Sequence, residues 1–85
     1  MKEVMIEKMK EMFVPMFVEA KKEVIASNYD PKKMKMTDTT IPNKIMKVAK
    51  TYSKQLMLEG TFISHWDLYE PVYNACVRES NRVNY

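Results

Sequence analysis

The sequence predicts an all-α fold, a small bundle of three to four helices formed by one domain that covers residues 1–85. The composition favours helices, because the chain holds a single glycine beside nine methionines and many lysines and glutamates. Apolar residues recur at steps of three and four in three segments, and turn residues separate these segments. A chain of 85 residues buries only a thin core, so association with a second subunit is a natural supplement.

The first helix is expected over residues 2–27. Its apolar stripe consists of Met5, Met9, Met12, Phe13, Met16, Phe17, Ala20 and Val24. Val4, Val14, Val18 and Ile25 lie outside that stripe, which makes the apolar face wider than one packing seam needs. Pro15 removes one backbone hydrogen bond, so the segment is either one kinked helix or two shorter ones. The kink is favoured, because no turn residues surround the proline.

A break follows at Asn28–Pro31, since Asn and Asp favour turns and a residue before proline avoids the helical region. Residues 32–40 show no period and are expected to form a loop. The next helix should run from about Thr40 to Glu59, with Thr39 or Thr40 as its N-cap. Gly60 then provides the left-handed residue that often ends a helix.

The last helix should begin at the capping pattern Ser64–Asp67 and kink or divide at Pro71. Four aromatic residues precede or follow this start, namely Phe62, Trp66, Tyr69 and Tyr73. Such rings stack bases in proteins that bind single strands. Their helical spacing and the neighbouring acids Asp67 and Glu70 favour a place in the core instead.

Residue types exclude several function classes. Cys76 is the only cysteine and His65 the only histidine, so neither a disulfide within the chain nor a structural zinc site is expected. No nucleophile, base and orienting group lie in a recognisable pattern, and we predict a protein that is not an enzyme and needs no cofactor. Charged residues interrupt every apolar run, so no membrane association and a cytoplasmic location are expected.

The charges are segregated along the chain. Residues 32–54 form a basic segment in which Asp38 is the only acid. Its seven lysines are Lys32, Lys33, Lys35, Lys44, Lys47, Lys50 and Lys54. At about 100° per residue, the four lysines from 44 onwards fall within roughly 120° of one another, opposite the apolar stripe.

Such a face has two interpretations. It can be a solvated surface that keeps a small protein soluble, although solvated faces usually mix both signs of charge. It can also contact phosphates, for which lysine is well suited as a flexible point charge. The prediction from the residues is therefore RNA binding through these seven lysines. The alternative is a protein-binding effector that docks on an acidic host protein.

The wide apolar face of the first helix predicts a homodimer. The interface residues expected from its methionine-rich edge are Met5, Met9, Met12, Phe13 and Met16.

The basic segment, from Lys32-Lys33-Met34-Lys35 through Lys54, covers about a quarter of the chain. Together with the richness in Met, Lys, Asn and Tyr, it resembles small accessory proteins of T4-like phages. Within that group it is similar to RNA-binding inhibitors of type III toxin–antitoxin systems. The resemblance implies a homodimer in the host cytoplasm that uses its lysines to bind RNA and thereby blocks an RNA-dependent host toxin.

Overall fold

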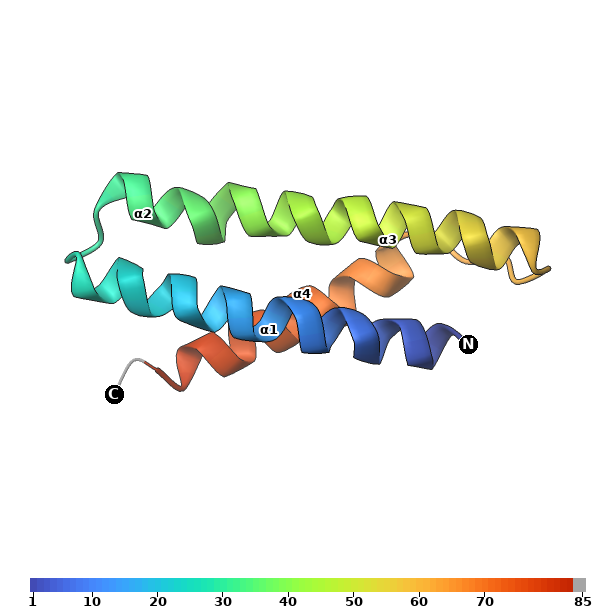
Figure 1. Cartoon of the computed structure of the whole chain (residues 1–85), viewed down its shortest axis with the longest axis horizontal. Coiled ribbons are helices and arrows are strands. Elements are labelled where there is room, and N and C mark those ends of the chain that lie inside the picture. The colour runs from blue at the N-terminus through green and yellow to red at the C-terminus, as the bar shows by residue number, and fades with distance from the viewer. Residues whose placement is uncertain (84–85) are drawn as a thin grey trace.

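The computed structural model describes residues 1–83 as an all-α fold with three helical rods (Figure 1). The first rod is α1 (Lys2–Ala26). The second consists of α2 (Pro31–Lys35), the π-helical turn η1 (Met36–Thr40) and α3 (Ile41–Leu58), which follow one another without a break. The third is α4 (Trp66–Asn81), which crosses the first two rods obliquely in Figure 1. The molecule is elongated, with principal extents of 47 × 21 × 15 Å.

Helix α1 is continuous, as the sequence predicted, and Pro15 lies inside it without dividing it. Pro71 likewise lies inside a continuous α4. Because proline has no N–H, the hydrogen bond that would run from residue 15 to the carbonyl of Glu11 cannot form. Burial of the opposite face of α1 stabilises the helix in spite of this lost bond.

The predicted break at residues 28–31 is confirmed. Asn28 and Tyr29 have positive φ angles of 58° and 64°, and the Tyr29 N–H donates to the carbonyl of Val24 at 2.8 Å. This bond closes the end of α1 in the manner of a Schellman motif. The carboxylate of Asp30 accepts a hydrogen bond from the Lys32 N–H at 2.9 Å, and Pro31 occupies the first turn of α2.

The prediction of a loop over residues 32–40 was wrong, because this segment is helical. The turn at residues 28–31 both ends α1 and starts α2, for which Asp30 is the N-cap. The second rod therefore begins about ten residues earlier than expected. Thr39 and Thr40 therefore cap nothing: Thr40 itself has helical backbone angles and makes no side-chain cap bond. The expected end is confirmed, since Gly60 has a φ of 90° and the Thr61 N–H donates to the carbonyl of Leu56.

The π-helical turn explains why no period was visible. The Ile41 N–H donates to the carbonyl of Met36, five residues back, so this turn holds one residue more than an α-turn. One extra residue rotates everything after it by about 100° relative to a continuous α-helix. With that rotation, Thr37 points to within about 20° of the buried stripe of α3. Thr37 is buried accordingly, and its hydroxyl donates to the Met34 carbonyl.

The core lies where the three rods meet. α1 packs against both α3 and α4, and α3 also packs against α4. The buried side chains that form the main cluster are Met5, Met9, Phe13, Phe17, Ala20, Ile41, Ile45, Ala49, Leu56, Leu68, Val72 and Cys76. At the start of α4 the predicted capping pattern is present: the Ser64 N–H donates to the Asp67 carboxylate, and the Trp66 N–H donates to the Ser64 hydroxyl.

Candidate nucleic-acid interface

Four lysines of α3 form an exposed face opposite the core. Lys44, Lys47, Lys50 and Lys54 are all exposed. The residues of α3 that face the other way, Ile41, Ile45, Ala49 and Leu56, have no exposed surface. The amphipathic pattern fixes this arrangement, because burying the apolar stripe turns the four ammonium groups towards solvent.

The lysines of α2 extend this face along the same rod. Lys32, Lys33 and Lys35 are exposed. With the rotation of about 100° caused by the π turn, Lys35 falls within about 20° and Lys32 within about 50° of the centre of the α3 lysines. Lys33 lies more than about 90° away, beside the face that the other six lysines share. From residue 32 to residue 54 the row spans roughly 33 Å at 1.5 Å per residue. We call these seven residues the lysine row.

No member of the lysine row has an acidic partner among the described residues. The ion pairs found within residues 1–83 involve the N-terminus, Lys10, Lys22 and Arg82. In α1, Lys10 lies 3.8 Å from Glu7 and Lys22 lies 3.3 Å from Glu19. The lysines of α1 are thus interleaved with carboxylates, whereas those of α2 and α3 leave their charge uncompensated.

This surface is suited to binding an extended polyanion. Several unpaired ammonium groups on one rigid helical face raise the local concentration of anions and can contact phosphates one by one. Lysine lacks the planar fork with which arginine recognises guanine, so such contacts carry little sequence information. The row contains no arginine.

Cys76 and the acidic side chains are the other groups with reactive chemistry in the part of the chain that the structure describes. Cys76 is fully buried, and this burial raises the pKa of its thiol to about 11, which makes it a poor nucleophile. Over residues 1–83, no group of three or more His, Cys, Asp or Glu side chains is placed to hold a metal ion. Within that same range no helix is long and apolar enough to cross a bilayer.

The residues predicted for a dimer interface differ in how far the structure exposes them. Met5, Met9 and Phe13 are buried in the chain's own core, and Met16 is half-buried against it. Met12 alone is exposed, at 48%. The homodimer stays a prediction, and any second copy that meets α1 in its folded form must use a surface other than Met9 and Phe13.

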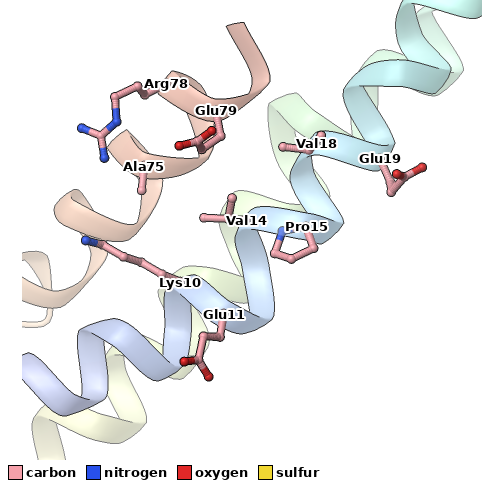
Figure 2. Close-up of a pocket in the computed structure, with 9 residues that line it drawn as sticks. All are labelled: Lys10, Glu11, Val14, Pro15, Val18, Glu19, Ala75, Arg78 and Glu79. Atoms are coloured by element: carbon pink, nitrogen blue, oxygen red, sulfur yellow. The ribbon is translucent and has the colours of Figure 1, made fainter. Parts of the chain in front are cut away.

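An apolar groove between α1 and α4 is one such surface. It has a volume of about 600 Å³, and Figure 2 shows Val14, Pro15 and Val18 of α1 opposite Ala75 of α4. Charged residues of both signs surround it, namely Lys10, Glu11, Glu19, Arg78 and Glu79. Val14 and Val18, two of the residues that widened the apolar face in the sequence, therefore line this groove.

The prediction that the aromatic residues lie in the core was wrong for two of them. Phe62 is 81% exposed and Trp66 is 50% exposed, whereas Tyr69 and Tyr73 are half-buried. Helical spacing placed Trp66 on the same side as Tyr69 and Tyr73, but Trp66 lies in the first turn of α4, at the edge of the packed region. Phe62 precedes the helix altogether, so the period carried no information about it.

The chain matches no protein-family model, and no curated protein or solved structure matches it.

Proposed function

We propose that this protein binds RNA through the lysine row, without catalysing a reaction. The observation that carries the proposal is that all seven lysines are exposed and none has a carboxylate within ion-pair distance in residues 1–83. Close like charges on one helix face destabilise the helix by a few tenths of a kcal/mol per pair. A bound phosphate backbone removes that repulsion and releases its own counterions, and both effects favour the complex.

The biological role that fits such binding is inhibition of an RNA-dependent toxin. The basic segment resembles TifA, a T4-like phage inhibitor of the ToxIN type III toxin–antitoxin system. A protein of this kind would act in the host cytoplasm as a homodimer that sequesters RNA.

The salt dependence of RNA binding tests the proposal. For four to six phosphate contacts to a single strand, log K against log salt should slope at roughly −3 to −4, or about −0.7 per contact. Lys47→Ala should make the slope shallower by about 0.7, and Lys47→Arg should preserve it, because charge alone is used. Fluorescence anisotropy of a labelled oligoribonucleotide over a series of KCl concentrations gives these slopes.

Lys8→Ala is the matched control, since Lys8 is an exposed lysine of α1 outside every ion pair in the described part of the chain. It should leave both affinity and slope nearly unchanged. An equal loss for Lys8→Ala and Lys47→Ala would mean that the lysine row is only a solvated face.

A second candidate function is docking on an acidic host protein. The observation that favours it is again the lysine row, whose unpaired ammonium groups suit the carboxylates of an acidic protein as well as phosphates. Protein purified in low salt separates the two functions. Nuclease-sensitive material absorbing at 260 nm supports RNA binding, whereas its absence together with a co-purifying acidic protein supports docking.

A further inference from the structure

Two large aromatic side chains are exposed near the end of α3. Phe62, in the connection between α3 and α4, is 81% exposed, and Trp66, in the first turn of α4, is 50% exposed. An exposed ring leaves apolar surface in contact with water at a cost of about 25 cal/mol per Å². These two rings stand four residues apart in the chain, in the connection between α3 and α4 and at the start of α4.

Trp66 belongs to a series of rings that leads from the surface to the core. Its ring meets Tyr69 edge to face at 5.6 Å between centroids, and Tyr69 stacks on Tyr73 at 5.5 Å with planes 10° apart. Tyr73 in turn meets the buried Phe17 edge to face at 6.2 Å. On its other side, Trp66 is flanked by His65 at 5.3 Å. These contacts hold the indole in a fixed orientation while half of its surface stays free.

The first turn of α4 lies close to the part of α3 that carries the lysine row. Lys54 is two residues from Leu56, and Trp66 is two residues from Leu68. Leu56 and Leu68 are fully buried in the same core cluster, and in Figure 1 the start of α4 lies beneath the second half of α3. Because Lys54 lies on the face of α3 opposite Leu56, a strand bound along the row reaches Trp66 only by passing round α3, a turn that a flexible single strand can make.

The charges around Trp66 favour a base over a phosphate there. Asp67 and Glu70 are exposed on the same turns of α4, and Glu59 is exposed in the preceding connection. These carboxylates repel phosphate groups, so the backbone phosphate of a nucleotide stacked on Trp66 has to point away from them. In the sequence, Asp67 and Glu70 were an argument against contact with nucleic acid. They are compatible with an RNA whose phosphates lie on α2 and α3 and whose base lies on α4.

We propose that Trp66, assisted by Phe62, stacks with an unpaired base of the RNA bound on the lysine row, so that the ligand is single-stranded at this end. The inference rests on the proposed function and adds the class of ligand. Base–aromatic stacking is tolerant of sequence, because every base has a π-face. A closed duplex offers no free base to stack on a side chain at its flank.

The intrinsic fluorescence of the protein reports on this contact directly, because Trp66 is the only tryptophan. Single-stranded oligoadenylate should quench the emission as it binds. Inorganic polyphosphate of similar length carries the charge without bases, and it should bind the lysine row without quenching. A blunt RNA duplex should behave like polyphosphate.

Substitutions test the same contact by affinity. Trp66→Ala should weaken oligoadenylate binding about 5- to 150-fold, the range for one stacked base, and should leave polyphosphate binding unchanged. Trp66→Phe should retain most of the affinity, which guards against an effect on folding. Leu58→Ala is the matched control, since Leu58 is 89% exposed at the end of α3 but carries no ring that could stack.

The outcomes separate the two proposals. If oligoadenylate binds without quenching, or if Trp66→Ala weakens both polyanions equally, stacking is wrong and the lysine row still binds phosphates. If neither oligoadenylate nor polyphosphate binds, the proposed function fails and the stacking proposal fails with it.

Discussion

Reversing one charge in the lysine row should make the fold more stable and should weaken RNA binding. On α3, Lys47 has Lys44 and Lys50 as its neighbours three residues away on the same face. Lys47→Glu replaces two repulsive pairs with two attractive ones, each worth about 0.2–0.5 kcal/mol before and after the change. The free energy of unfolding should therefore rise by roughly 1–2 kcal/mol at low ionic strength.

The same substitution in α1 should act in the opposite direction. Lys10 lies 3.8 Å from Glu7, so Lys10→Glu exchanges one attractive pair for a repulsive one. The expected loss of stability is about 0.4–1 kcal/mol. RNA binding should be weakened strongly by Lys47→Glu, abolished when Lys44 is also changed to Glu, and almost unaffected by Lys10→Glu.

Thermal unfolding followed by circular dichroism measures the stability change. For a chain of this length, 1 kcal/mol corresponds to roughly 4–8 °C in Tm. Repeating the melts in 1 M salt should remove most of both differences, because exposed charges are screened there. If Lys47→Glu lowers Tm at low salt, the lysines of α3 do not repel one another as described, and the argument from uncompensated charge fails.

Three further predictions concern the core, the alkaline limit and association. Leu56→Ala should cost about 2–5 kcal/mol because Leu56 is fully buried, while Leu58→Ala, at a position 89% exposed, should change stability by less than about 0.5 kcal/mol; urea titrations compare the two. Burial raises the pKa of the Cys76 thiol from 9.0 to about 11, so the folded state keeps a proton that the unfolded state loses. Stability should accordingly be complete below pH 9 and decrease by up to about 2–3 kcal/mol as the pH rises to 11, and a Cys76→Ala variant should show a smaller decrease in the same pH series. Light scattering should give about twice the chain mass of 10.1 kDa, and Val18→Glu, in the groove between α1 and α4, should restore the single-chain mass without unfolding the protein; a single-chain mass for the unaltered protein at high micromolar concentration would rule out the homodimer.

Local rules predicted most of the fold. The period of the apolar residues located α1, α3 and α4, and the residues at 28–31 and at Gly60 located their ends, because turn chemistry depends on a few neighbouring residues. The segment from 32 to 40 was missed because a search for a fixed period of 3.6 fails across a π turn, which shifts the phase within the segment. Asp30 and Pro31 were the available signal, since Asp followed by Pro also begins helices.

Exposure at the edge of the core was the part that the sequence could not provide. The exposed character of the four α3 lysines followed from the stripe opposite them, and in the structure all seven lysines of the row are exposed. For Phe62 and Trp66, burial depends on whether another helix covers that end of the molecule. No pattern along the chain reports the length of a neighbouring helix, so spacing placed Trp66 in the core, and for Phe62, which precedes α4, spacing carried no information.

The π turn gives the second rod a property that substitutions cannot reveal. Removing one residue from 36–40 would allow a continuous α-helix from Pro31 to Leu58 and would change no lysine. It would nevertheless rotate Lys32 and Lys35 by about 100° relative to the lysines of α3, so that a straight polyanion could follow one group or the other but not both. The number of residues in this segment, rather than their identity, therefore sets the direction in which half of the charge points.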